Sequence, residues 1–297
     1  MDISKIATEQ RNPNTLHIDE LSTLEMVRLI NEEDKKVAAA VEVETEHIAA
    51  AVDVIAECLM AGGRLIYSGC GTSGRLGVLD AVECPPTYST KPEQIVGLMA
   101  GGYPAMFQAV EGAEDDEELG VGDLKEINFG KDDVLVGIAA SGRTPYVIGA
   151  MKYAKSLGAK VIGVTCCKDS QIDQLADIGI APMPGPEVVM GSTRMKSGTA
   201  QKMVLNMLST GAMIKMGKVY GNLMVDVKPS NQKLVDRCAT IVQTATGVSR
   251  EEAKQTLEQC DYRPKTAIVM IEKGVSAEEA LRLLEEAKGR VALAVHL

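Results

Sequence analysis

Glycine and hydroxyl residues gather in segment 69–74, directly after the apolar run 65–67. A strand, a glycine-rich turn and a helix in this order present backbone N–H groups and the positive helix end to an anion. The spacing matches G-x-G-x-x-G, but no carboxylate follows the next apolar run to bind the ribose of a dinucleotide. The hydroxyls of Thr72 and Ser73 instead suit a compact phosphate group. We therefore predict a phosphate-binding loop that includes Gly71, Thr72 and Ser73.

Two further segments have the same character. Residues 140–145 combine hydroxyls with glycine and a cation, and Pro145 is well placed to open a helix. Residues 185–199 again combine glycines, hydroxyls and cations. Three such loops at one edge of a sheet favour anion binding over ordinary turns. The candidate substrate-binding residues in these two segments are Ser141, Gly142, Arg143, Thr144, Glu187, Ser192, Arg194 and Lys196.

The elements that must position these loops alternate between strand and helix patterns. Apolar runs predict strands at 64–68, 94–99, 133–139, 160–165 and 178–182. Helical patterns follow at 73–83 (closed by Pro85-Pro86), 104–113, 144–157 and 198–216. This alternation is typical of a doubly wound α/β fold, with a mainly parallel five-stranded sheet flanked by helices. Ligands of such sheets bind at the carboxyl ends of the strands.

Helical segments flank the predicted central domain, which covers 54–217. Residues 1–53 hold a polar lead, a capping box and the start of an Ala- and Val-rich helix suited to packing or dimerisation. We expect the polar lead, 8–13, to be either a disordered tail or an arm that reaches a partner's site. Residues 240–297 form a small C-terminal helical domain, with a bundle of three short helices within 249–288 and no motif that indicates chemistry.

The net charge and the cysteines limit the classes of partner that the protein can bind and the cellular compartment in which it can work. The formal net charge of the 297 residues is 31 − 41 = −10, which argues against nucleic acid or an anionic membrane as a partner. The seven cysteines are scattered and odd in number, which is a poor arrangement for a zinc site and typical of reduced thiols. No signal peptide or membrane-length apolar run is visible. We expect a cytoplasmic protein without a bound metal.

The chain resembles the N-acetylmuramic acid 6-phosphate etherase family, which is built on a sugar isomerase (SIS) domain. The resemblance runs nearly end to end and is carried by segments 8–13, 21–26, 71–77, 83–87 and 191–199. Segments 83–87 and 191–199 are more specific to the etherases than the Gly-Thr-Ser turn at 71–73. The resemblance implies a homodimer with no metal or organic cofactor. It also implies conversion of N-acetylmuramic acid 6-phosphate and water to N-acetylglucosamine 6-phosphate and D-lactate, in cell-wall amino sugar recycling.

This reaction requires two acid/base groups. The opened sugar ring has an aldehyde that acidifies the C2 proton; a base removes that proton, the lactyl group leaves once its oxygen is protonated, and water adds back. By resemblance the two groups are Glu83 and Glu114. Glu83 also lies at the expected carboxyl end of its helix, where the negative helix end disfavours a charged carboxylate and suits a general acid. Glu114 lies in the acidic run 111–118, which is typical of a solvated face, so only the resemblance singles it out.

Two other functions remain open. An aldose–ketose isomerase on the SIS scaffold would use a carboxylate base and a sugar phosphate, but it would not explain segment 83–87. A non-catalytic sugar-phosphate sensor that binds DNA should carry a basic helix-turn-helix, whereas residues 1–60 hold more acids than bases. For the etherase we expect Arg194 or Lys196 to contact the substrate, and a partner chain to complete the site.

Overall fold

Five short apolar segments form a parallel sheet, as the alternation predicts. The computed structural model describes residues 7–227, 229 and 232–297, so the first six residues of the predicted segment 1–53 lie outside it. The strands are β1 (Leu65–Gly69), β2 (Ile95–Met99), β3 (Val134–Ile138), β4 (Lys160–Val164) and β5 (Ile178–Ile180). They pair in the order β2-β1-β3-β4-β5. Strands β1 and β3 are buried at every position, because helices cover both faces of the sheet.

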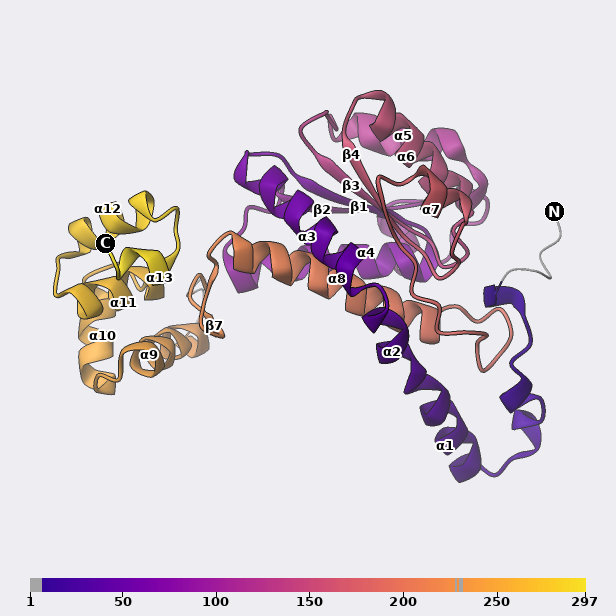
Figure 1. The fold of residues 1–297 in the computed structure, drawn as a ribbon, viewed down its shortest axis with the longest axis horizontal. Helices are drawn as coiled ribbons and strands as arrows, with labels where there is room; N and C mark the ends of the chain where they lie inside the picture. Colours follow the sequence, from indigo (N-terminus) through magenta and orange to yellow (C-terminus); the bar gives the residue numbers. More distant parts are fainter. Residues whose placement is uncertain (1–6, 228, 230–231) are drawn as a thin grey trace. The chain divides into compact units, whose positions relative to one another are not determined.

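Helices lie on both sides of this sheet, as Figure 1 shows. One side holds α3 (Thr45–Met60), α4 (Gly71–Tyr88) and α8 (Lys196–Lys215), and the other holds α5 (Glu117–Glu126), α6 (Pro145–Ser156) and α7 (Gln171–Leu175). Ile66 and Leu135 of the strands pack with Val147 and Met151 of α6 in one buried cluster. The doubly wound α/β fold is therefore confirmed.

Further helices precede and follow the sheet. The N-terminal region forms α1 (Thr23–Asp34) and α2 (Lys36–Glu42), and the predicted capping box at Ser22 is present. Short 3-10 helices are η2 (Ala7–Glu9), η3 (Pro13–Thr15), η4 (Ile18–Glu20), η5 (Tyr103–Met106) and η6 (Ala113–Asp115). After α8 come β6 (Val219–Tyr220), β7 (Leu223–Met224), α9 (Gln232–Thr246), α10 (Arg250–Glu258), α11 (Pro264–Lys273), α12 (Ala277–Glu286) and α13 (Val291–Ala294).

The chain divides into two compact units. The first holds the described residues up to Val82 together with Glu93–Ser209, and the second holds Glu83–Pro92 and Thr210–Leu297. The second unit has its own apolar core, in which Val242, Leu257 and Ile268 are fully buried. The boundaries drawn from the sequence at 53/54, 217 and 240 stay predictions.

The C-terminal helices are more numerous than the sequence pattern indicates. The three helices expected within 249–288 are α10, α11 and α12, and α9 and α13 pack with them in the same core. Ser249 and Ser276 open α10 and α12 by accepting hydrogen bonds from the backbone N–H of Glu252 and Glu279. These two helix starts are local signals and are therefore visible in the sequence.

The helix predicted at 104–113 is wrong. This segment contains the single turn η5, irregular backbone and the start of η6. Gly112 adopts a left-handed conformation with φ of 77°, which no continuous helix permits. The helix begins later, at α5, inside the acidic run that was expected to be only a solvated face. Asp116 caps it by accepting a hydrogen bond from the N–H of Leu119.

The prediction that Pro85-Pro86 closes its helix is also wrong. Helix α4 contains both prolines and ends at Tyr88. Proline lacks an N–H group, so the carbonyls of Ala81 and Val82 lose their usual helical donors. The φ that proline fixes is nevertheless helical, and the backbone continues for one more turn. Glu83 therefore does not lie at a helix end, and the electrostatic argument for its role as an acid does not hold.

Candidate functional site

The strand order places the switch point of the sheet between β1 and β3. Ligands of doubly wound sheets bind beyond the carboxyl ends of the strands at this point. Gly69 pairs with Ile138 at the last position of both strands, so segments 70–73 and 139–144 begin side by side. The first two predicted phosphate loops thus lie where this fold binds its ligands.

Close backbone packing explains the glycines of the first loop. A Cβ on Gly69 would lie 2.7 Å from the backbone nitrogen of Gly74, and Gly71 has a φ of +55°. Helix α4 begins at Gly71, so Thr72 and Ser73 lie in its first turn. The N–H groups of a first turn have no helical acceptors, and the positive helix end attracts anions. Backbone and hydroxyl donors therefore meet at one end of α4.

The second loop contains a glycine whose backbone conformation and close surroundings disfavour any side chain. Gly142 has a φ of +67°, and a Cβ there would lie 2.0 Å from Ser170 Oγ. Pro145 opens α6, as the sequence predicts. Thr144 occupies the N-cap position without capping the helix, and its Oγ1 donates a hydrogen bond to Glu114 Oε1 at 3.1 Å. A carboxylate from the acidic run is thereby held against this loop.

Glu114 connects the two loops. Besides accepting the hydrogen bond from Thr144, it lies beside Cys70 of the first loop. Burial and the nearby charge of Glu114 raise the pKa of the Cys70 thiol to about 11. Glu117, three residues further along the acidic run, instead pairs with Lys152 at 2.8 Å on the surface. The contacts in the structure thus distinguish Glu114 from Glu117, whereas the sequence does not.

The first turns of α8 lie against the first loop. A Cβ on Gly198 would lie 3.3 Å from Thr72 Cγ2, which shows how closely the two helix starts approach. One turn later, Gln201 Oε1 accepts a hydrogen bond of 2.8 Å from Ser73 Oγ. Gln201 is 1% exposed. The N-terminal end of α8 therefore lies next to that of α4.

Sequence reasoning missed Gln201. It lies four residues before Leu205 and seven before Leu208, which places it on the apolar face of the predicted helix. A polar side chain on such a face was the available signal, because a buried amide needs a hydrogen-bond partner.

Glu187 and Lys196 are held inside the first unit. The two carboxylate oxygens of Glu187 accept hydrogen bonds of 2.9 Å from the backbone N–H groups of Lys196 and Ser197, so Glu187 caps α8. Lys196 is 1% exposed, and its Nζ donates to Glu33 Oε2 at 2.8 Å and to the carbonyl of Pro184 at 3.0 Å. Both side chains shape the start of α8, and the ammonium group of Lys196 is engaged within the first unit.

The polar lead packs into the first unit, so the expectation of a disordered tail is wrong, whereas an arm that reaches a partner's site stays a prediction. Asn12 is buried, and its Nδ2 donates to Glu33 Oε2 at 2.8 Å and to the carbonyl of Pro186 at 3.1 Å. Asn14 Nδ2 donates to Glu33 Oε1 at 2.9 Å. These polar residues therefore satisfy a buried carboxylate within their own chain.

The buried Glu33 predicts a specific dependence of stability on pH. Burial opposes its ionisation, but hydrogen bonds from two lysines and two asparagines outweigh it and lower the pKa from 4.5 to about 2. The stabilisation is therefore present above pH 4.5 and is lost as the pH falls towards 2. We expect Glu33→Gln to lower the free energy of unfolding at pH 7 by about 3–5 kcal/mol, because Lys196 loses its buried partner.

Chemical denaturation of both proteins between pH 7 and pH 3 measures this effect. The gap in unfolding free energy should narrow as the pH falls below 4.5, because Glu33 then gains a proton in the unfolded chain while it stays ionised in the folded protein. Glu32→Gln is a matched control, since Glu32 is the preceding residue and pairs with Lys35 at an exposed position. A gap that stays constant over this range would show that the charge of Glu33 does not contribute.

The remaining predicted residues are more open. Arg143 and Ser141 are half-buried in the second loop, Ser192 is half-buried and Arg194 is exposed. Neither arginine forms an ion pair or hydrogen bond with any residue that the structure describes. Glu83 is exposed on α4 and belongs to the second unit. Both arginines are therefore unengaged cations in segments that carry predicted site residues.

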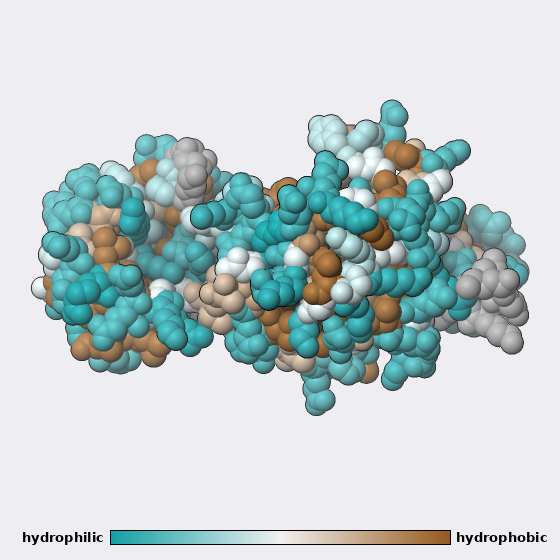
Figure 2. Space-filling view, turned by 90° about the horizontal axis from the view of Figure 1, so that it is seen from above, coloured by the Kyte–Doolittle hydropathy of each residue, from teal (hydrophilic) through white to brown (hydrophobic). Residues whose placement is uncertain are grey.

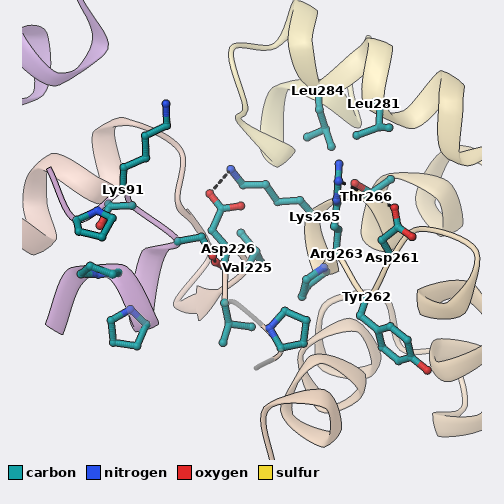
Figure 3. A pocket seen from close by; sticks show the side chains of 18 residues that line it. Lys91, Val225, Asp226, Asp261, Tyr262, Arg263, Lys265, Thr266, Leu281 and Leu284 are labelled. Carbon is teal, nitrogen blue, oxygen red and sulfur yellow. Dashed lines mark hydrogen bonds and ion pairs between the residues drawn. The ribbon is translucent and has the colours of Figure 1, made fainter. Parts of the chain in front are cut away.

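A separate cavity of about 830 Å³ lies wholly within the second unit (Figure 3). Its lining includes prolines of segment 85–92, Val225, Asp226 and the start of α11. Lys265 extends towards Asp226 and pairs with it at 2.7 Å. Burial lowers the pKa of Lys265, and the charge of Asp226 opposes this effect. The sequence pattern assigned no chemistry to this region.

Residues 7–227, 229 and 232–297 contain no group of three or more His, Cys, Asp or Glu side chains arranged to hold a metal ion. Among these same residues, no helix combines the length and apolar character that crossing a membrane requires.

Models of known protein families match most of the chain. Residues 47–155 match the glucokinase regulatory protein N-terminal SIS domain, and residues 123–211 match the SIS domain. Residues 221–278 match the C-terminal lid domain of glucokinase regulatory protein. A solved structure of a protein from Escherichia coli CFT073 superposes with a TM-score of 0.50 at 18% identity, over 68% of this chain and 97% of that one. This likeness supports the SIS fold alone.

Close relatives cover nearly the whole sequence. A protein of Photorhabdus laumondii, named N-acetylmuramic acid 6-phosphate etherase, is 60% identical over 91% of this chain and 90% of its own. Proteins of the same name are 57% identical in Clostridium botulinum strain Langeland, over 99% of this chain and 98% of that one, and 59% identical in Photobacterium profundum, over 91% and 90%. The chain therefore belongs to the N-acetylmuramic acid 6-phosphate etherase family.

Proposed function

We propose that this protein cleaves the lactyl ether of N-acetylmuramic acid 6-phosphate, giving N-acetylglucosamine 6-phosphate and D-lactate. The observation that carries the proposal is the position of Glu114, which Thr144 binds at 3.1 Å beside the loops that end β1 and β3. Those loops offer hydroxyl and backbone donors for a phosphate, so a carboxylate base lies next to a phosphate anchor. Relatives at 57–60% identity carry the etherase name.

The proposed reaction proceeds by elimination and hydration. Glu114 removes the C2 proton of the ring-opened sugar, and Glu83 protonates the oxygen of the departing lactyl group. Water then adds across the double bond. The hydroxyl of Thr144 orients the Glu114 carboxylate, which is exposed and therefore accessible to a substrate. Positioned proton transfers of this kind contribute roughly 10²–10⁴-fold each.

A lactate assay distinguishes this function from its alternatives. Purified protein is incubated with N-acetylmuramic acid 6-phosphate, and D-lactate is measured over time. The etherase releases lactate and N-acetylglucosamine 6-phosphate in equal amounts. A sugar-phosphate isomerase would convert an aldose to a ketose without releasing lactate, and a sensor would bind the sugar without turnover. Absence of lactate release would refute the etherase proposal.

Phosphate is proposed to be the main anchor of the substrate. Ser73 lies in the first turn of α4, so Ser73→Ala should raise KM by about tenfold or more with a smaller fall in kcat, since a hydrogen bond to a charged group is lost. N-acetylmuramic acid without phosphate should be a very poor substrate. Steady-state kinetics on both sugars measure these effects. Similar turnover of the two sugars would contradict the phosphate loop.

The lactyl carboxylate requires a cation, and we propose Arg194. Arg194 is exposed and makes no ion pair with the described residues, whereas Lys196 is occupied by Glu33. A planar guanidinium can bind a carboxylate through two parallel hydrogen bonds. Lys196 then acts through the start of α8 rather than on the substrate.

The active unit is proposed to be a homodimer with a shared site. Leu24, Val27 and Val43 of the N-terminal helical region are 59%, 55% and 79% exposed, which a dimer interface would cover. Figure 2 shows hydrophobic patches between hydrophilic areas on the face that it presents. Specific activity should fall on dilution, in step with a shift from dimer to monomer in sizing chromatography. A fully active monomer would contradict the shared site.

A cytoplasmic location is proposed with this function. None of the seven cysteines, all of which the structure describes, forms a disulfide, and five of them are buried. Reduced thiols of this kind are usual in the cytoplasm, where disulfides are rare.

A further inference from the structure

The hydrogen bonding of Gln201 is incomplete, although the residue is 1% exposed. Its Oε1 accepts the proton of Ser73 Oγ at 2.8 Å, but its Nε2 is buried and has no hydrogen-bond partner among the residues that the structure describes. A buried N–H group without an acceptor destabilises the folded state, and such groups are rare in proteins. The orientation of this amide therefore needs a reason beyond packing.

The same hydrogen bond decides what Ser73 can offer to a ligand. A hydroxyl carries one proton, and Ser73, which is 7% exposed, gives that proton to Gln201. A phosphate group offers only acceptors at its ionised oxygens. In this arrangement Ser73 faces the loop with lone pairs and cannot donate to the phosphate that the loop is built to bind.

Rotation of the Gln201 side-chain amide by half a turn reverses the direction of its hydrogen bond with Ser73. Nε2 then lies where Oε1 lay, within hydrogen-bond distance of Ser73 Oγ, and donates to it. The Ser73 proton is released towards the loop, and one buried N–H group gains an acceptor. We propose that Gln201 is a positioning residue whose amide orientation sets the direction of the Ser73 hydroxyl and thereby the affinity for phosphate. This inference rests on the proposed phosphate-anchored function.

The surroundings hold Gln201 in place for this role. Asn206 and Ser209, further along α8, donate hydrogen bonds of 2.7 and 3.1 Å to Asp80 of α4. Gly198, one turn before Gln201, lies against Thr72. Because the two helices are fixed on both sides of Gln201, the side chain keeps its distance from Ser73. Rotation of its terminal amide needs no movement of either helix.

A double-mutant cycle tests the coupling. Gln201→Met keeps a similar size but removes both donor and acceptor, and Ser73→Ala removes the hydroxyl. We expect each change to raise the Kd for N-acetylglucosamine 6-phosphate, measured by calorimetry, by about tenfold. The double variant should bind no more weakly than the weaker single variant. Additive losses, or a Kd of Gln201→Met close to that of wild type, would overturn the proposal.

Asn206→Leu is the matched control, because it removes an amide hydrogen bond between α8 and α4 without touching Ser73. It should lower the melting temperature and leave the Kd unchanged, because Ser209 still bonds to Asp80 and Gly198 still lies against Thr72, so that the two helices stay fixed on both sides of Gln201. If it weakens binding as much as Gln201→Met does, the effect of Gln201 is merely structural. Gln201→Glu supplies a second signature, since an ionised carboxylate accepts the Ser73 proton but cannot donate.

Gln201→Glu should therefore bind N-acetylglucosamine 6-phosphate more weakly than Gln201→Met, and this difference should vanish when Ser73 is Ala. A difference that persists without the hydroxyl would indicate direct repulsion of the phosphate and would contradict the proposed coupling. The double-mutant cycle measures binding alone, so it does not require the protein to turn over a substrate. Wild-type protein that binds the sugar phosphate but releases no lactate would refute only the etherase function, whereas failure to bind it would refute both proposals.

Discussion

Glu114→Gln is expected to lower the rate of D-lactate release by about 10²–10⁴-fold, with little change in the binding of N-acetylglucosamine 6-phosphate. The amide keeps the size of the side chain and still accepts the hydrogen bond that Thr144 Oγ1 donates at 3.1 Å. It cannot take up a proton at neutral pH, so the C2 proton has no base. Initial rates and calorimetric binding, measured on the same preparation, separate these two effects.

Carboxylates of the same acidic run provide the controls. Glu111 is exposed, and Glu117 is engaged by Lys152 at 2.8 Å. Glu111→Gln and Glu117→Gln should therefore release lactate near the wild-type rate. If Glu111→Gln proved to be the inactive variant, the position of this acidic run relative to the family would be misassigned, and Glu114 would lose its role.

Glu83→Gln is the second variant with a large expected effect. If Glu83 protonates the departing lactyl oxygen, its replacement should lower kcat by roughly 10²–10⁴-fold while the phosphate loops still bind the sugar. The loss should be smaller for a substrate analogue whose leaving group is a weaker base and needs less protonation. Comparing kcat for the lactyl ether and for such an analogue measures this difference.

Glu93→Gln is the control for Glu83, because Glu93 is also exposed and lies ten residues further along the chain. It should leave kcat and KM unchanged. Near wild-type turnover of Glu83→Gln would remove Glu83 from the mechanism. Equal losses on both substrates would show that Glu83 acts at a step other than departure of the lactyl group.

The position of the phosphate loops follows from local sequence. Apolar runs that alternate with helical patterns require a parallel sheet, and the carboxyl ends of its strands meet at one edge. Segments 70–73 and 139–144 follow two such runs and pair side by side in the structure. Pro145 and the caps at Ser22, Ser249 and Ser276 act within one turn of their own helices, so the sequence alone locates them.

Short-range patterns misplace elements where two local preferences compete. Pro85-Pro86 reads as a helix end, yet α4 continues to Tyr88, because the φ of proline is helical and only the N–H groups are lost. Segment 104–113 reads as a helix, yet Gly112 turns the backbone left-handed before α5 begins. In both cases a second local preference, the helical φ of proline or the left-handed turn at Gly112, overrides the first.

The partners of the polar side chains were decided by the tertiary structure alone. Ser73 meets Gln201 across 128 residues and Glu33 meets Lys196 across 163, while Thr144 meets Glu114 across 30. Helical and strand periodicities relate residues only a few positions apart, so they cannot reveal such pairs. The sequence by itself determined which loops carry donors for an anion. Only the packing of α1, α6 and α8 decided that Thr144 meets Glu114, that Lys196 meets Glu33 and that Ser73 meets Gln201. The physical reason is that burial forces each polar group to find a partner.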